Sequence, residues 1–329
     1  MQLGRISRET PDGPEARLVA VDTEGGRVID LRAAESLRLQ RGGATAVSAS
    51  RIAAAFFPGS MSAAIATGEA FLDEAARASA AGDHASLPLD GLRWLAAIDP
   101  PTVRDCVAFK THIDNMASRA GREVSPLHYE YPRYYKGSSA GLIGHDATVP
   151  WPPYTEAMDY ELELGFVIGP GGHSITPDEA LGHVFGVTIY DDFSARDIQG
   201  GEMASGFGPA KGKDFGTAVG PWITTRDELD VHTLEVRARV NGEEWSHASS
   251  STMWWSPEEL IGFISWGETL LPGDLIGSGT VGFGCGAELG RFLKPGDVVE
   301  LEVSGIGVLR NTVGEPEPRR WQPEPRPRD

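Results

Sequence analysis

One stretch of this chain alternates strictly between two kinds of side chain over its first half: Asp159-Tyr160-Glu161-Leu162-Glu163-Leu164-Gly165-Phe166-Val167-Ile168. Alternation with a period of two predicts a β-strand with two unlike faces. The apolar residues at 160, 162, 164, 166 and 168 fall on one face. Glu161 and Glu163 fall on the other, about 7 Å apart along the strand. Two carboxylates on one face repel each other unless water or a cation separates them.

A second acidic pair helps to decide whether water or a cation separates Glu161 from Glu163. For a single pair, a water-exposed face on a half-solvated strand is the simpler interpretation. Asp191-Asp192, however, follows another apolar run at 184–190. Three carboxylates drawn from two strands form an oxygen-rich cage suited to a hard divalent ion such as Mg²⁺, Mn²⁺ or Ca²⁺. Both interpretations stay open, and the second pair favours the metal site.

Composition limits the class of protein and its partners. The 329 residues include 41 glycines and 23 prolines, and 40% are hydrophobic, which is typical of a loop-rich globular chain. A formal net charge of −18 disfavours nucleic acid and anionic membrane surfaces as partners. Cys106 and Cys285 show no metal-ligand spacing, and no apolar run resembles a membrane span or a signal-peptide core. We expect a reduced, cytoplasmic protein.

The first part of the chain, residues 1–100, is predicted to be a small N-terminal α+β domain. Residues 17–31 are expected to form a hairpin, because a Glu-Gly-Gly sequence at its centre permits the turn. The Ala-rich segments 47–57 and 60–81 have helical spacing. Pro100-Pro101 marks the boundary, since neither residue continues a helix or a strand ladder.

The next part, residues 101–313, is predicted to be mainly β with short helices, so the fold class is α+β. Expected strands include 234–240, 275–280 and 298–303. Capping boxes predict helices that begin after Thr176 and Ser256. The aromatic segment 129–135 is expected at a sheet edge or in a loop because Pro132 interrupts it, and 145–157 is rich in turn residues. The Pro-rich charged tail at 314–329 is expected to be disordered.

Three further stretches carry side chains suited to chemistry. Arg196 and Gln199 are one helical turn apart, where they either hold a carboxylate or enolate oxygen or form a solvated helix end. The stretch 208–217 lacks the order of a phosphate-binding loop, but its glycines let a lysine project into a nearby site. His112 follows Asp105 by seven residues and lies where a predicted strand opens into a helix, a position suited to a general base. A covalent serine or cysteine hydrolase is not predicted, and the two cysteines show no evident arrangement with a histidine.

In this order, the motifs resemble the fumarylacetoacetate hydrolase family. The matching segments are 159–164, 192–199, 212–222, 278–280 and 305–311. The resemblance covers roughly residues 103–313, with a weaker match of the N-terminal module to the small leading domain of the longer members. It implies a mixed β-sandwich roll with short helices, preceded by a small α+β domain and assembled as a homodimer.

The resemblance also implies roles for individual residues. The implied metal ligands are Glu161, Glu163, Asp192 and Asp105, with Thr217 near the metal, and the implied ion is Mg²⁺ or Mn²⁺, with Ca²⁺ as a further alternative. The implied catalytic residues are His112 as general base and Lys213 at the developing enolate, and the implied substrate-binding residues are Arg196, Gln199, Thr280 and Tyr135. Acylpyruvate-cleaving members often pair the histidine with a glutamate three residues later. Here that position is Asn115, so either a more distant acid such as Glu288 supports His112 or the hydrolytic step is impaired.

Such a site predicts a metal-dependent hydrolase that cleaves a C–C bond in an acylpyruvate, fumarylacetoacetate-like or other diketo acid through a metal-stabilised enolate. Without water attack, the same site serves an isomerase, decarboxylase or dehydratase of a 2-oxo or 2-hydroxy-dienoic acid, and Asn115 favours this alternative. A non-catalytic small-molecule binder is the third possibility, against which His112 and Lys213 argue. The expected partner is a small carboxylic-acid substrate.

Overall fold

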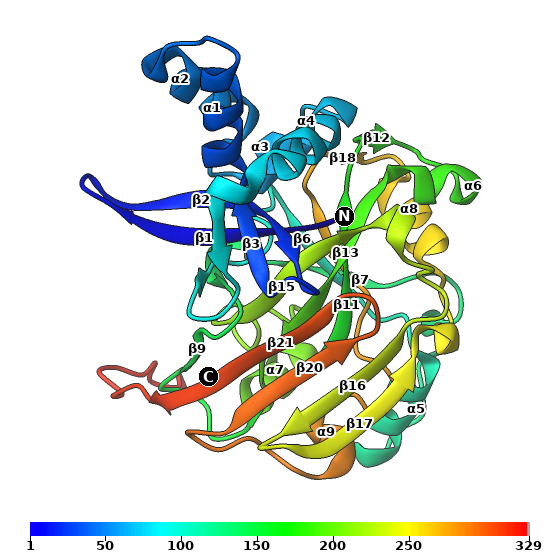
Figure 1. Ribbon diagram of the computed structural model, residues 1–329. Coiled ribbons are helices and arrows are strands. Elements are labelled where there is room, and N and C mark those ends of the chain that lie inside the picture. Colours follow the sequence, from blue (N-terminus) through cyan, green and yellow to red (C-terminus); the bar gives the residue numbers. More distant parts are fainter. Residues whose placement is uncertain (328–329) are drawn as a thin grey trace.

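The computed structural model describes residues 1–327 and places many of their strands in one twelve-stranded sheet (Figure 1). The main path has the order β4-β3-β2-β1-β15-β13-β11-β19-β6-β7, while β5 pairs with β1 and β8 with β15. The bounds are β1 (Gln2–Thr10), β2 (Gly13–Asp22), β3 (Arg27–Asp30), β4 (Ser86–Pro88), β5 (Arg93–Trp94), β6 (Val103–Cys106), β7 (Tyr134–Gly137), β8 (Leu142–Ile143), β11 (Leu162–Ile168), β13 (Val184–Asp192), β15 (Thr217–Thr225) and β19 (Leu275–Gly277).

The predicted acidic strand is an inner strand of this sheet, β11, paired antiparallel with both β13 and β19. Its apolar face belongs to the larger hydrophobic core, which is shared with a second sheet of five strands. The order of that sheet is β17 (Glu243–Ser249), β16 (Glu235–Val240), β20 (Val298–Val303), β21 (Gly307–Pro316) and β9 (Thr148–Trp151). The predicted strands at 234–240 and 298–303 are confirmed, and so is the α+β, mainly β, class. The strand predicted over 275–280 is present only over 275–277, where β19 ends.

The opposite face of the large sheet changes character along β11. Toward its end, Val167 lies in a second core with Phe71 and other residues of the N-terminal helices. Figure 1 shows these helices, blue to cyan, grouped at one end of the molecule. Toward the start of β11 the same face carries Glu161 and Glu163, so one face is apolar under the helices and acidic beyond them.

The N-terminal segment confirms the predicted hairpin as β2 and β3. The predicted helices correspond to α2 (Ala46–Phe56), α3 (Met61–Ile65) and α4 (Glu69–Ala80). The elements not predicted include β1 and α1 (Leu31–Arg41), both of which carry several charged residues. The signal for α1 was Asp30, whose side chain caps the helix by accepting from the N–H of Ala33. Because β1 pairs with β15, the sheet continues past residue 100, and the proposed domain division stays a prediction.

Short helices and two-stranded ladders complete the fold. The helices are α5 (Lys110–Arg119), α6 (Pro177–Ala180), α7 (Arg196–Ser205), α8 (Pro257–Ser265) and α9 (Gly286–Leu289). The ladders join β10 (Met158–Asp159) to β14 (Ser194–Ala195), and β12 (Gly172–His173) to β18 (Thr269–Leu270). Both capping boxes are present, and β7 is an edge strand, as predicted.

Two predictions need correction at the C-terminal sheet. The turn-rich segment 145–157 contains β9, and the predicted tail begins too early, because β21 continues to Pro316 by pairing with β9. Residues 317–327 form no helix or strand. Among the described residues, no helix combines the length and the apolar character needed to cross a membrane.

Candidate metal and catalytic site

Four buried carboxylates meet on the acidic face of the large sheet. Glu161 precedes β11 and Glu163 lies within it, while Asp105 comes from β6 and Asp192 ends β13. Their ligand atoms all lie within 4.8 Å of one another, and none of the four residues is more than 5% exposed. The alternative in which this face is a solvated surface is therefore wrong.

The backbone around the cluster is shaped to bring these carboxylates together. Gly277 of β19 lies between them, and a Cβ there would be 2.3 Å from Asp105 Oδ1 and 3.1 Å from Glu163 Oε2. Glu163 Oε2 accepts from the backbone N–H of Gly279 at 3.0 Å. Asp105 Oδ1 is buried without a hydrogen-bond partner among the described residues. An unpartnered buried oxygen beside three more carboxylates fits a hard divalent cation, which takes oxygen ligands.

Two basic side chains, the buried Lys213 and the largely buried Arg196, offset part of this negative charge. Lys213 Nζ lies 2.6 Å from Glu161 Oε2 and 2.5 Å from Asp192 Oδ2. Arg196 Nη1 lies 2.7 Å from Glu161 Oε1. With all four carboxylates ionised, the two cations would leave an excess of two negative charges, which one divalent ion would neutralise.

The pKa values follow from burial and from this charge pattern. Burial, together with the nearby Asp192, raises the pKa of Asp105 to about 8. Burial beside Asp105 likewise raises the pKa of Glu163 well above its ordinary value. Burial also works to raise the pKa of Glu161, but Lys213 and Arg196 outweigh it, so that this pKa is lowered. Without a cation, these shifts therefore favour protons on Asp105 and Glu163 over Glu161.

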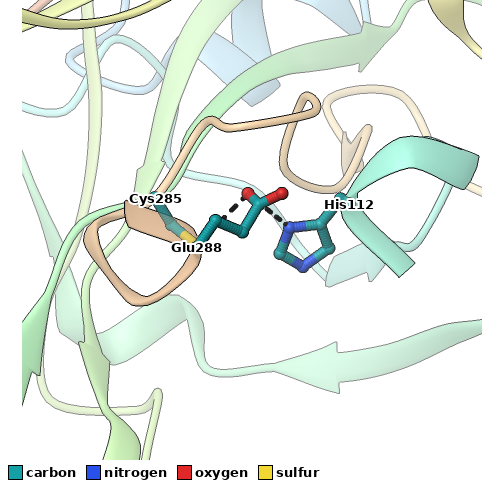
Figure 2. Close-up of side chains that lie close together, drawn as sticks. All are labelled: His112, Cys285 and Glu288. Atoms are coloured by element: carbon teal, nitrogen blue, oxygen red, sulfur yellow. Dashed lines mark hydrogen bonds and ion pairs between the residues drawn. The ribbon is translucent and has the colours of Figure 1, made fainter. Parts of the chain in front are cut away.

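His112 lies beside this cluster and is held by Glu288 (Figure 2). It belongs to α5, and its Nδ1 donates to Glu288 Oε2 at 2.9 Å. Asn115 Nδ2 donates to Glu288 Oε1 at 2.8 Å, and the N–H of Phe283 to the same oxygen at 2.9 Å. Burial opposes the charge of Glu288, but its interactions with His112, Asn115 and the N–H of Phe283 together outweigh burial and lower the pKa of this carboxyl. Glu288 is therefore the distant acid that supports His112, and Asn115 positions Glu288.

One contact in Figure 2 was not foreseen from the sequence. The Cys285 thiol donates to Glu288 Oε2 at 3.4 Å, close to His112. Cys285 therefore lies near His112, although the hydrogen bond of its thiol goes to Glu288. Burial nevertheless raises the pKa of this thiol well above its usual value, which disfavours the reactive thiolate.

The remaining predicted residues surround the four carboxylates. Three of them donate hydroxyl hydrogen bonds: Tyr135 to Asp192 Oδ2 at 2.6 Å, Thr217 to Asp192 Oδ1 at 3.4 Å, and Thr280 to Glu163 Oε1 at 3.3 Å. Gln199 accepts from Arg196 at 3.0 Å, which confirms that the two share one side of a helical turn.

A cavity of about 590 Å³ opens over this cluster. The predicted residues that line it are Asp105, His112, Tyr135, Glu161, Glu163, Arg196, Gln199, Lys213 and Thr280. Its apolar wall comes from two helices, with Ile113 and Met116 on α5 and Met203 on α7. Asp192 and Thr217 do not line the cavity. Asp192 contacts Tyr135 and Lys213, which do, and Thr217 donates to Asp192.

A match to a family model identifies this arrangement. The model described as Fumarylacetoacetate (FAA) hydrolase C-terminal covers residues 102–314, well over half of the chain. The chain belongs to the fumarylacetoacetate hydrolase family. The resemblance of the motifs is thereby confirmed, and the four carboxylates lie within the matched region.

Individual family members are also similar to this chain. Oxaloacetate tautomerase FAHD2A, mitochondrial, from Bos taurus is 34% identical over 229 residues, which are 69% of this chain and 71% of that protein. The solved fumarylacetoacetate hydrolase of Exiguobacterium antarcticum has a TM-score of 0.71 and 26% identity, over 95% and 99% of the two chains. A 5-carboxymethyl-2-hydroxymuconate delta-isomerase from Mycobacterium smegmatis has a TM-score of 0.65 and 26% identity, over 96% and 100%. All three names denote enzymes, but their reactions differ.

The metal site predicts a loss of affinity in Glu163→Ala. Removing one of four converging oxygen ligands is expected to weaken Mg²⁺ or Mn²⁺ binding on the order of 100-fold, because even partners of metal ligands contribute 10- to 100-fold. Calorimetric titration measures this directly. Glu35→Gln is the matched control, since Glu35 is equally buried but belongs to α1, outside the metal site, where it pairs with Arg38. Equal metal affinities in wild type and Glu163→Ala would exclude this site.

The raised carboxyl pKa values predict how pH affects stability. In the metal-free fold, Asp105 keeps its proton up to about pH 8, whereas in the unfolded chain it loses it near pH 4. Its contribution is therefore fully present below about pH 4 and is lost as pH rises through about 8. A cation that replaces the proton restores stability, so the rise in Tm caused by Mg²⁺ should be larger at about pH 8 than at about pH 6. Thermal unfolding with Mg²⁺ and with a chelator tests this, and a rise independent of pH contradicts it.

Proposed function

We propose that this protein is a divalent-metal-dependent enzyme that hydrolyses a C–C bond in an acylpyruvate or a related diketo acid. One arrangement carries the proposal. His112, supported by Glu288, and Lys213, held by two carboxylates, line the same cavity beside the metal site. A base that activates water, together with a buried ammonium and a metal site that stabilise an enolate, are the groups that this reaction requires.

Each group has a distinct task in the proposed reaction. A divalent ion held by the four carboxylates would supply a Lewis acid for the oxygens of a 2-oxo acid. His112 donates Nδ1–H to Glu288, so Nε2 is the nitrogen that takes a proton from water. The water oxygen then bonds to the acyl carbonyl carbon, and the C–C bond breaks with its electron pair left on the pyruvate-derived carbon. Lys213 stabilises that negative charge, and the proton returned from His112 completes pyruvate and the free acid.

The second candidate is a tautomerase or isomerase of a 2-oxo or 2-hydroxy-dienoic acid. It is favoured by the 34% identity to a protein named oxaloacetate tautomerase. In this reaction His112 moves a carbon-bound proton and no C–C bond breaks. The support that Glu288 gives His112 favours hydrolysis, because activation of water depends on an oriented base.

A substrate screen separates these candidates. The purified protein is incubated with Mg²⁺ or Mn²⁺ and with acylpyruvates, oxaloacetate and dienoic acids, while enol absorbance and products are followed. Pyruvate plus a free acid supports hydrolysis; keto–enol or double-bond shifts without cleavage support the second candidate. Loss of CO₂ from oxaloacetate indicates decarboxylation, and no turnover of any substrate would leave the third possibility, a binding protein.

The proposed ion remains Mg²⁺ or Mn²⁺, with Ca²⁺ as the further alternative, and the proposed ligand is a small carboxylic acid. A homodimer and a cytoplasmic location stay predictions. The name of the bovine relative states a mitochondrial location for that protein.

A further inference from the structure

A fifth carboxylate, that of Asp159, lies behind the site and does not line the cavity. Asp159 ends β10 and is 0% exposed. Its backbone pairs with Ser194 of β14, two residues before Arg196. A buried carboxylate is costly unless hydrogen bonds satisfy it. The partners of Asp159 therefore indicate its role.

On one side, Asp159 holds the guanidinium of Arg196. Its Oδ2 accepts from Arg196 Nε at 2.8 Å and forms an ion pair with Nη2 at the same distance. The third nitrogen, Nη1, lies 2.7 Å from Glu161 Oε1 and donates to Gln199 Oε1 at 3.0 Å. Because a guanidinium is planar and rigid, fixing Nε and Nη2 also sets the direction of Nη1 at the edge of the cluster.

On its other side, Asp159 holds the beginning of α9. Its Oδ1 accepts from the backbone N–H of Gly286 at 2.7 Å, and its Oδ2 from that of Ala287 at 2.9 Å. A Cβ on Gly286 would lie 2.6 Å from Oδ1, so the close approach requires glycine here. These bonds join segments that are more than 120 residues apart in the chain.

The short helix held in this way presents the acid that supports the base. Glu288 follows Ala287 directly and accepts from His112 Nδ1 and Asn115 Nδ2. A second contact comes from Arg119, whose Nε donates to the carbonyl oxygen of Glu288 at 2.8 Å. α9 has only four residues, so its own backbone bonds do little to fix its position.

We propose that Asp159 is a positioning residue that couples the two halves of the site, holding Arg196 against Glu161 and placing Glu288 against His112. The inference rests on the proposed function, since it assigns a task to the base and to the guanidinium. An aspartate suits this place because both of its oxygens accept hydrogen bonds. Asparagine keeps one acceptor and turns an NH₂ group toward a donor.

The first test needs no substrate and uses the full-length metal-loaded protein. Asp159→Asn should speed hydrogen exchange of the amides of Gly286 and Ala287 by about 10-fold or more, because their charge-assisted bonds weaken. The matched control is Asp274→Asn. Asp274 is equally buried, accepts from the N–H groups of Thr102 and Leu271, and forms an ion pair with an arginine away from α9. It should leave the exchange of α9 unchanged.

The second test asks whether the effect passes through the two proposed partners. Asp159→Asn should lower kcat/KM by 10- to 100-fold, the scale seen for outer partners of a site. In double-mutant cycles, Glu288→Gln should add little further loss in kcat, and Arg196→Lys little further rise in KM. Asp274→Asn combined with Glu288→Gln should instead give additive effects. Asp159→Ser replaces Asp159→Asn in both tests if the latter does not fold.

The outcomes separate this inference from the proposed function. Unchanged exchange of α9 in Asp159→Asn overturns the inference whether or not a substrate is known. Faster exchange with additive losses in either cycle also overturns it, because Asp159 would then stabilise the fold without coupling the two halves. If none of the screened substrates turns over, the proposed function fails while the exchange result still decides whether Asp159 holds α9.

Discussion

Lys213→Met is expected to lower kcat by about 10²- to 10³-fold, the effect of losing one oxyanion-stabilising donor. Lys213 is 3% exposed, and its ammonium lies between Glu161 and Asp192. Burial opposes its charge, but these carboxylates outweigh it and raise the pKa of Lys213, so the side chain stays protonated at any working pH. Methionine keeps the approximate length and removes the charge. Steady-state kinetics on the substrate identified by the screen measures the change.

A neighbouring lysine provides the control for this prediction. Lys211 lies two residues earlier, is exposed, and places its Nζ 4.6 Å from the ring centroid of Tyr154. Lys211→Met should leave kcat nearly unchanged. Since Lys213 also neutralises two ligands, its removal leaves more negative charge in the cluster, and metal affinity should not fall. A wild-type kcat in Lys213→Met, or a loss explained entirely by weaker metal binding, would contradict the assigned task.

The parts of the site that could be predicted from the sequence depend on local patterns. Alternation alone places Glu161 and Glu163 on one face, and strand spacing brings them into one cluster with Asp192. The turn of helix that joins Arg196 to Gln199 is also local. Whether the acidic face is solvated depends on what covers it. Alternation says nothing about that, and the second acidic pair and the family resemblance were needed to favour the buried site.

The parts that could not be predicted depend on contacts between distant segments. His112 and Glu288 are 176 residues apart, and no spacing rule relates them. Asn115 appeared to weaken the case for hydrolysis because it replaces a nearby glutamate. In the fold, Asn115 donates to Glu288, so the acid is supplied from α9 and the objection loses its basis. The role of Asp159 depends in the same way on where α9 lies.

The N-terminal segment shows a related limit. The helix α1 was missed because three of its eleven residues are arginines and one is a glutamate. In the fold, the charge of Arg38 is balanced by two buried acids, Glu35 of the same helix and Glu74 of α4. Pairing of charges across two helices allows a polar segment to be buried, and hydrophobic periodicity does not detect it.

His112→Ala is expected to lower the kcat of C–C cleavage by about 10²- to 10⁴-fold, the range for loss of a general base. His112 lines the cavity and is held by Glu288, but it does not belong to the carboxylate cluster that would bind the metal. Metal and substrate binding should therefore stay close to wild type, and kcat should carry the loss. His232→Ala is the matched control, because His232 also pairs with a glutamate, Glu258 at 2.9 Å, on the surface.

The same variant distinguishes activation of water from formation of the enolate. Exchange of the substrate's acidic C–H for deuterium requires only that the enolate forms, and Lys213 and the metal site remain in place in His112→Ala. We therefore expect that, in deuterium oxide with Mg²⁺ and a diketo acid, NMR will show exchange that persists while cleavage is lost. Loss of both indicates that His112 removes the carbon-bound proton, as in the tautomerase or isomerase reaction. Cleavage at the wild-type rate would exclude His112 as the base, and the hydrolytic mechanism would then need another group to activate water.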